Sequence, residues 1–151
     1  METAFLFNIR KNDMIDGMGL AKGTKVLVTA GASGIGRTIA ETFEQAGAKI
    51  HICDNSDIAL EKCSTDHPSW GVTKCDVSNP SEVDTLFDEV QKNLSGLDVL
   101  VNNAGIAGPT SPVHEMDIED WNRTIEINLN GQFYCARRAV PMLKASHNAS
   151  M

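Results

Sequence analysis

The stretch that decides the fold is "TAGASGIGR", residues 29–37. It follows the apolar run at residues 25–28 and leads into Ile39, Ala40 and Phe43, which recur at helical spacing. Glycines between a strand and a helix permit a tight turn and let a phosphate approach backbone N–H groups. The stretch therefore predicts a strand–turn–helix unit that binds a phosphate group.

The rest of the chain alternates between strand-like and helix-like apolar periods. This alternation predicts an α/β fold with right-handed crossovers, a doubly wound parallel sheet of the Rossmann-like kind with strand order 3-2-1-4. The third strand is polar enough to be an edge strand, and the segment 55–68 offers at most a short helix. The predicted strands are residues 25–29, 48–54, 72–76 and 97–101.

Two further helices have recognisable starts. Asn79 is a predicted N-cap, with Pro80 at the first helical position and Glu82 closing a capping box. Asp117 is predicted to cap a long helix that runs through "CARRAVPMLKAS". Apolar residues along one side of that helix are Trp121, Ile125, Leu129 and Phe133.

Two loops with unusual composition follow the first and the fourth predicted strand, at residues 29–36 and 102–108. In the order 3-2-1-4 these two strands are neighbours, and ligands bind outside their carboxyl ends. The sequence therefore predicts a single ligand site built from both loops.

Two phosphate chemistries compete for the glycine turn. A nucleoside-triphosphate loop would need a lysine where this chain has Arg37, and no second apolar strand ends in an aspartate placed for magnesium. A dinucleotide site needs an acidic residue at the end of the second strand, and Asp54 stands there. The dinucleotide interpretation is favoured. The alternative for Asp54 is an ordinary polar residue at the start of a loop.

Composition excludes several classes of partner. The 151 residues carry a formal net charge of −7, which argues against nucleic acid or an anionic membrane as the main partner. The four cysteines lack metal-ligand spacing, so we predict no metal and a reducing, cytoplasmic location. Residues 1–21 are predicted to be a tail, with neither a signal peptide nor a membrane span and with Met14 and Met18 as alternative starts, and residues 22–151 one domain.

Four motifs make residues 22–151 resemble the short-chain dehydrogenases/reductases. Ala30 is a departure, because the family most often has glycine there. The motifs are Thr29 with Gly31, Gly34 and Gly36; Asp76-Val77; Asn102-Asn103-Ala104-Gly105; and Ile127-Asn128-Leu129-Asn130-Gly131.

The resemblance implies a role for each matching position. The turn would hold the cofactor pyrophosphate, Asp54 its adenine ribose, Asp76 and Val77 the adenine, and Asn128 would distort its helix and anchor a water of a proton relay. The alternative for Asn128 is a polar residue on a helix surface. The cofactor-binding residues implied are Thr29, Gly31, Ser33, Gly34, Ile35, Gly36, Asp54, Asp76, Val77, Asn102, Ala104 and Gly105.

The resemblance also implies the chemistry. Members of the family transfer hydride between a nicotinamide and a small alcohol or carbonyl substrate, and they are homodimers or homotetramers. We predict NAD rather than NADP, because Asp54 would repel the extra phosphate and Ser33 stands where NADP-preferring relatives carry a basic residue.

The family's catalytic serine, tyrosine and lysine belong to a fifth strand and the following helix, and this chain stops at "SHNASM", where that strand should begin. Tyr134, the only tyrosine, is followed by Arg138 at the spacing of the catalytic lysine, but lies about 120° around the helix from Asn128. We therefore predict that Tyr134 packs or lies at an interface. The chain is thus predicted to be the cofactor-binding half of an oxidoreductase, as a fragment, a truncated product or part of a longer polypeptide, and to be inactive alone. The alternative is a non-catalytic nucleotide-binding or interaction module.

Overall fold

The computed structural model describes residues 20–151, so nearly all of the predicted tail, with Met14 and Met18, lies outside the described residues. Four parallel strands form one sheet in the order β3-β2-β1-β4, which confirms the predicted doubly wound arrangement. β3 ends two residues earlier than predicted, and β4 begins two residues later. The strands are β1 Lys25–Thr29, β2 Lys49–Asp54, β3 Gly71–Lys74 and β4 Val99–Val101.

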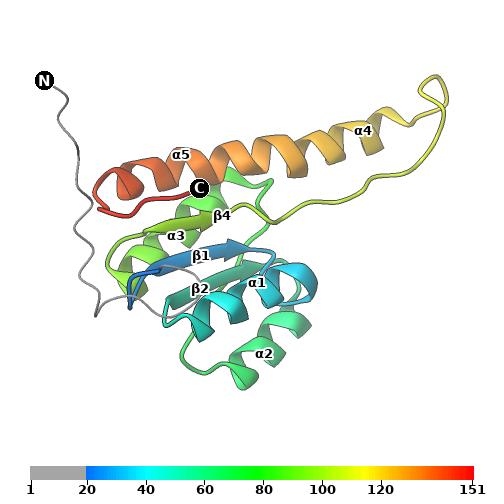
Figure 1. Ribbon diagram of the computed structural model, residues 1–151. Coiled ribbons are helices and arrows are strands. Elements are labelled where there is room, and N and C mark those ends of the chain that lie inside the picture. The colour runs from blue at the N-terminus through cyan, green and yellow to red at the C-terminus, as the bar shows by residue number, and fades with distance from the viewer. Residues whose placement is uncertain (1–19) are drawn as a thin grey trace, which may run out of the picture.

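Helices cover both faces of the sheet (Figure 1). α1 Gly34–Gln45 and α2 Asp57–Asp66 lie on one face, and α3 Pro80–Leu94 and α5 Gly131–Lys144 lie on the other. None of the helices in the described part of the chain is both long and apolar enough to cross a membrane. The sheet is therefore the middle layer of three, as a parallel sheet requires.

Alternate residues of each strand point into the two cores. Val26 and Val28 of β1 pack with Ala40 of α1, whereas Leu27 belongs to the cluster that contains Phe87 of α3 and Leu143 of α5. Since both faces are covered, successive residues of the strand are buried, and the strand reads as a continuous apolar run.

The start of α3 confirms Asn79 as its N-cap but not the capping box. The Asn79 Oδ1 accepts hydrogen bonds from the N–H groups of Ser81, at 3.0 Å, and Glu82, at 3.4 Å. The Glu82 carboxylate accepts from the Asp76 N–H at 2.8 Å and from the Asn79 Nδ2 at 2.9 Å. The Asn79 N–H donates to the Asp76 carbonyl oxygen, so the donor that a capping box would use is already satisfied.

The segment 55–68 forms a full helix, α2, where the sequence predicted at most a short one. Ser56 caps it, with its Oγ accepting from the Ala59 N–H at 3.3 Å. Only Leu60 and Cys63 of its residues are buried, so the apolar stripe was too narrow to predict a ten-residue helix.

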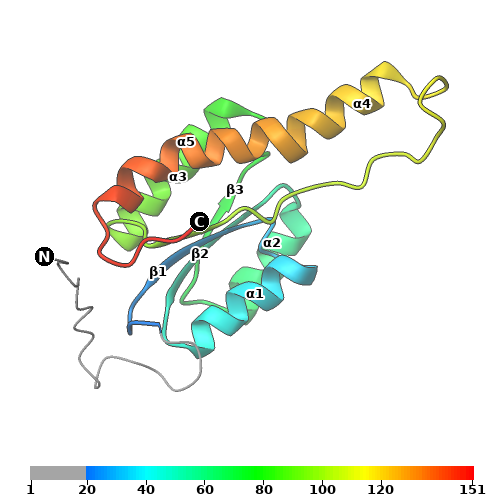
Figure 2. The ribbon, with the colours of Figure 1, turned by 45° about the horizontal axis from the view of Figure 1, so that its top comes forward.

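The predicted long helix is present but not continuous. It consists of α4 Ile118–Ile125, a π-helical turn at Glu126–Asn130, and α5. Asp117 caps its start, as predicted, by accepting a hydrogen bond from the Glu119 N–H at 2.8 Å. α4 buries none of its residues and extends away from the sheet (Figure 2).

The apolar side expected for this helix is mostly its exposed side. The side chains of Trp121, Leu129 and Phe133 are exposed by 54%, 61% and 60%. Contact with the sheet is made instead by another set of residues, which contains Ile127, Cys135, Ala139 and Leu143. We call the exposed set Ile118, Trp121, Leu129 and Phe133 the outer stripe.

Beyond α5 the chain returns to the edge of the sheet, beside β4 (Figure 1). The Ser150 N–H donates to the Asp98 carbonyl oxygen at 2.9 Å, and the Leu100 N–H donates to the Ser150 carbonyl oxygen at 3.1 Å. Val99 and Ser150 thereby form a parallel bridge. This is the position at which the sequence predicts a fifth strand to begin.

Candidate functional site

The glycine turn is packed closely against neighbouring side chains and backbone. A Cβ on Gly31 would lie 2.7 Å from the Cγ2 of Ile52, and a Cβ on Gly36 would lie 2.6 Å from the Nδ2 of Asn103 and closer still to the Ala30 carbonyl oxygen. Both positions therefore exclude any side chain. Glycine at these positions keeps the turn compact, so that a pyrophosphate at the start of α1 could come close to the backbone N–H groups.

The conformation of the turn explains two of its residues. Gly34 has a φ of +53°, where L side chains are strained, and lies exposed with Ser33 and Ile35 at the start of α1. Ala30 adopts a φ of +49°, so the one residue that departs from the family's glycine holds a left-handed backbone conformation. That conformation costs an L residue roughly 1–2 kcal/mol.

The start of α1 leaves backbone donors open. Ser33 is its N-cap residue, and within the described residues its side chain accepts no cap hydrogen bond. The first N–H groups of a helix carry partial positive charge and attract anions. The turn and the helix end together form a site for a phosphate group.

A network of hydrogen bonds joins the loop after β1 to the loop after β4. The Thr29 Oγ1 accepts from the N–H groups of Asn103, at 3.0 Å, and Ala104, at 2.9 Å. The Asn103 Nδ2 donates to the carbonyl oxygens of Thr29, at 3.0 Å, and Ala30, at 3.2 Å. Thr29 is 1% exposed, so the junction is rigidly placed in the core at the switch point. Asn102, beside it, is half-buried at the end of β4.

Asp54 lies at the end of β2, beside the turn. Its Oδ2 accepts from the Ala32 N–H at 3.3 Å and its Oδ1 from the Ser56 N–H at 3.1 Å, and the residue is 8% exposed. The carboxylate is thus oriented by backbone on both sides. It retains lone pairs that can accept from hydroxyl groups of a ligand.

One cleft brings together candidates from three different segments of the sequence. It has a volume of about 170 Å³ and opens beside Ala30. Among the predicted site residues, those that line it are Asp54, Asp76, Val77, Ala104 and Gly105. Its remaining lining residues are Asn55, Cys75, Ile106, Arg123 and Ile127. Gly31, Ser33, Gly34, Ile35 and Gly36 belong to the adjoining turn rather than to the wall of the cleft.

Asn128 lies within the π-helical turn, so the helix is distorted where the resemblance implies it. Its Nδ2 donates to the Ile106 carbonyl oxygen at 2.7 Å, and its Oδ1 accepts from the Ile106 N–H at 2.8 Å. The side chain therefore ties the loop after β4 to the helix. It is more than a polar residue on a helix surface.

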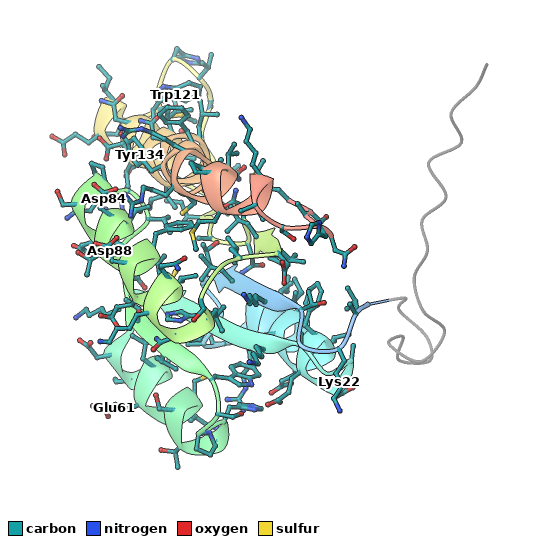
Figure 3. All side chains as sticks on the ribbon, turned by 90° about the vertical axis from the view of Figure 1, so that its left-hand side faces the viewer. Lys22, Glu61, Asp84, Asp88, Trp121 and Tyr134 are labelled. Carbon is teal, nitrogen blue, oxygen red and sulfur yellow. The ribbon has the colours of Figure 1, made fainter. Side chains whose placement is uncertain are left out.

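Tyr134 packs against the core between the sheet, α3 and α5 and is half-buried. Its ring is tilted against that of Phe133, with centroids 5.8 Å apart. Arg138, the residue at lysine spacing, donates instead to Asp88 of α3 at 2.7 Å. Figure 3 shows Tyr134 and Asp88 on neighbouring helices. The packing predicted for Tyr134 is confirmed.

The cysteines are all buried. Burial raises the pKa of the Cys135 thiol to about 12, and the neighbouring Cys75 thiol and burial hold the pKa of Cys53 well above its usual range. Thiols with such pKa values are unreactive at neutral pH. In the part of the chain that the structure describes, no group of His, Cys, Asp and Glu side chains could hold a metal ion.

Sequence reasoning missed several residues of this region. Asn103 stands in the predicted tetrad, but its bonds to both loop backbones could not be read from spacing. Arg123 of α4 also lines the cleft, and the sequence offers no signal for its position there. Asn55, Ile106 and Ile127 also line the cleft, next to predicted residues, but were not predicted to do so.

Comparison with known proteins identifies the family. The family model for short chain dehydrogenase matches residues 24–151. A short chain dehydrogenase/reductase named dpmpG, from Macrophomina phaseolina, is 36% identical over 126 residues, which are 80% of this chain and 72% of the relative. A 3beta-hydroxysteroid dehydrogenase 2 from Eggerthella lenta is 37% identical over 122 residues, which are 78% of this chain and 47% of the relative.

A solved structure agrees with the fold. The crystal structure of a short-chain dehydrogenase/reductase, glucose/ribitol dehydrogenase, from Brucella melitensis matches with a TM-score of 0.75 and 33% identity, over 80% of this chain and 52% of that one. The chain therefore spans about half the length of the Eggerthella and Brucella proteins. On these matches and the geometry of its two loops, the chain belongs to the short-chain dehydrogenase/reductase family.

Proposed function

We propose that this chain binds NAD and supplies the cofactor-binding half of an oxidoreductase that acts on a small alcohol or carbonyl substrate. The observation that carries the proposal is the junction of Thr29 and Asn103, which fixes two ligand loops against each other at the switch point. The compact glycine turn at Gly31 and Gly36 and the open start of α1 fit a pyrophosphate. When bound, the cofactor supplies the hydride acceptor or donor.

In this proposal each part of the site holds one part of the cofactor. The turn at residues 31–36 binds the pyrophosphate through backbone N–H groups, with Ser33, Gly34 and Ile35 as its exposed wall. The Asp54 carboxylate accepts from the adenine ribose hydroxyls. Asp76 and Val77 flank the adenine, and Asn102, Ala104 and Gly105 line the path toward the nicotinamide.

The proposed preference for NAD over NADP is electrostatic. Charge-assisted hydrogen bonds from two ribose hydroxyls to Asp54 would contribute about 1.5–3 kcal/mol, and the same carboxylate would repel a 2′-phosphate. We expect a preference of at least about tenfold, or about 1.4 kcal/mol.

Catalysis needs more than these 151 residues contain. Their single tyrosine, Tyr134, has Arg138 where a lysine would be needed, so they hold no tyrosine–lysine pair to transfer the proton. Asn128 can hold a water or position the loop at Ile106, but it cannot be the acid or base. The 151-residue chain is therefore proposed to bind the adenosine half of NAD and to turn over no substrate.

The outer stripe supports a proposal on assembly. Ile118, Trp121, Leu129 and Phe133 expose apolar surface along one side of α4 and the start of α5. Exposed apolar surface of this kind marks an interface. The intact protein is proposed to be a cytoplasmic homodimer or homotetramer that covers this stripe.

Calorimetry with NAD and NADP tests the proposed function. We expect weak NAD binding by the 151-residue chain, at least tenfold weaker NADP binding, and loss of the preference in Asp54→Ala. The matched control is Asp88→Ala, which removes a carboxylate on the other face of the sheet and should leave both affinities unchanged. Equal affinities for the two cofactors, or a preference that survives in Asp54→Ala, would contradict the assignment.

The rival function is a non-catalytic nucleotide-binding or interaction module. The reading frame beyond Met151 distinguishes the two. A serine followed by a Tyr-x-x-x-Lys motif on a strand and helix supports the oxidoreductase. A stop codon directly after Met151 favours the rival.

A further inference from the structure

Arg37 is the only basic residue between Ala30 and Ala48. It therefore carries the only positively charged side chain of the glycine turn and α1. It lies one helical turn after Ser33, to whose carbonyl oxygen its N–H donates at 3.1 Å. Ala32, next to Ser33, donates to the Asp54 carboxylate. One turn of helix spans about 5.4 Å, so the backbone of Arg37 starts close to the proposed ribose position.

The guanidinium of Arg37 nevertheless points away from that position. Its Nε donates to the Glu41 Oε1 at 2.8 Å, and its Nη2 donates to the Asp66 Oδ2, at the end of α2, at 2.9 Å. Glu41 lies one turn further along α1, so the side chain extends toward the C-terminal end of the helix. Long side chains on helices more often point back toward the N-terminal end, which here is the end that carries Ser33.

The two carboxylates are themselves held in place. Asp66 also accepts from the Lys62 Nζ at 2.7 Å. Next to Asp66, the ring of His67 stacks on Trp70, with centroids 4.0 Å apart, and its Nε2 lies 3.2 Å from both the Glu41 Oε1 and the Arg37 Nη2.

Charge and burial agree with this geometry. Hydrogen bonds with Glu41 and Asp66 raise the pKa of Arg37. The bond from Arg37 lowers the pKa of Glu41, and bonds from Lys62 and then Arg37 lower the pKa of Asp66. The Arg37 side chain is 21% exposed. All three groups are therefore charged at neutral pH, and the positive charge of Arg37 is matched by two negative ones.

We propose that Glu41 and Asp66 determine cofactor preference from outside the ribose site, by holding Arg37 where it cannot meet a 2′-phosphate. They are positioning residues that act through Arg37, and the inference rests on the proposed dinucleotide function. Asp54 repels the extra phosphate, and the Glu41–Arg37–Asp66 group withholds the one cation of α1 that could compensate. Release of Arg37 lets its side chain take the direction toward Ser33 and bind that phosphate.

The test compares two probes of the adenosine site, 5′-AMP and 2′,5′-ADP, which differ by the 2′-phosphate. Calorimetry at low ionic strength gives the ratio of the 5′-AMP Kd to the 2′,5′-ADP Kd, and low salt limits screening. The starting variant is Asp54→Asn, which removes the direct repulsion. Addition of Glu41→Gln and Asp66→Asn is expected to raise the ratio at least fivefold, and further addition of Arg37→Gln is expected to return it to the starting value.

A matched control is present on the other face of the sheet. Arg138 is paired with Asp84 at 3.5 Å and with Asp88 at 2.7 Å, both on α3 (Figure 3). Asp84→Asn with Asp88→Asn in the same Asp54→Asn background removes two carboxylates and releases an arginine, but far from the turn. This control should leave the ratio unchanged, so general charge effects are separated from the release of Arg37.

Each result decides between the possibilities. Three results would overturn the inference: an unchanged Kd ratio after Glu41→Gln and Asp66→Asn, an equal rise of the ratio in the α3 control, or a rise that persists with Arg37→Gln. In each of these cases, binding of 5′-AMP would still support the proposed site. If wild-type chain fails to bind 5′-AMP, the proposed function itself falls. Circular dichroism melting checks folding, and the single variant Asp66→Asn, which keeps the Glu41 pair, should give an intermediate rise if the double variant unfolds.

Discussion

His51 makes the stability of this domain depend on pH. The residue lies in β2, is fully buried, and has Gly71 of β3 packed directly against its ring. Its Nε2 lies 2.9 Å from the Thr73 Oγ1, while its Nδ1 has only the distant Nδ2 of Asn93, at 3.5 Å. Burial lowers the pKa of His51 to about 4, despite an opposing effect of Glu89.

The sign and size of the effect follow from that pKa. A histidine whose pKa is lower in the folded state than its unfolded value of about 6.5 must stay neutral to fold, so stability is present above pH 6.5 and is lost as pH falls toward 4. The shift of about 2.5 units corresponds to about 3 kcal/mol in full, of which about 2 kcal/mol falls between pH 7 and pH 4.5.

Urea unfolding of the 151-residue chain at pH 7 and pH 4.5 measures this loss. The variant His51→Gln removes the titrating group, so its free energy of unfolding should fall by about 2 kcal/mol less than that of the wild type over this range. The matched control is His114→Gln, because it removes an exposed histidine instead of a buried one.

An equal pH dependence in wild type and His51→Gln would refute the reasoning. It would mean that the ring accepts a proton inside the fold without cost. A larger loss in His51→Gln than in wild type would contradict the sign, since it would require the folded state to favour the charged imidazole.

Three further predictions concern the turn, the outer stripe and activity. Ala30→Gly should raise the free energy of unfolding by about 1 kcal/mol, because glycine relieves the positive φ at the cost of about 0.5–1 kcal/mol of chain entropy; a destabilised variant in urea unfolding would contradict this. The mean mass of the 151-residue chain in light scattering should rise with concentration, and less steeply in Leu129→Glu, whereas a clean monomer peak at high concentration would refute an uncovered apolar surface. Assayed with NAD and NADH against a panel of alcohols and ketones, the chain should turn over nothing, and turnover that vanishes in Tyr134→Phe would show that Tyr134 is the acid after all.

The sheet was predictable because its evidence is local. Each strand is a short apolar run, the glycine turn marks the first crossover, and the strand order follows from the alternation of elements. The full length of α2 could not be predicted, because only Leu60 and Cys63 face the core and the remaining residues show no helical period of apolar side chains. Its existence depends on packing against β2 and β3, which sequence spacing cannot report.

The residues of the candidate site can be named from the sequence, but their contacts cannot. Asp54, Asp76 and Gly105 were placed in one site by their motifs, and the structure brings them to one cleft. The bonds of Asn103 to two carbonyl oxygens depend on how the loops after β1 and β4 meet, a contact between residues 73 or more positions apart. The π-helical turn at Asn128 likewise depends on backbone geometry that a helical period does not encode.

The residues proposed to bind the cofactor and Asn128, proposed for the proton relay, lie in parts of the chain that are packed very differently. The turn, Thr29 and Asp54 are surrounded by β1, β2 and α1, and their hydrogen bonds lie in the core. Asn128 instead holds Ile106 through two exposed hydrogen bonds, and the adjoining α4 buries none of its residues. Local opening is easiest where few apolar contacts are buried, so α4 and the loop after β4 can open while the turn keeps its geometry. If the proposed roles hold, the adenosine half of the proposed site survives such opening, whereas the Asn128 contact does not, and affinity for the cofactor and the proposed relay can then change independently.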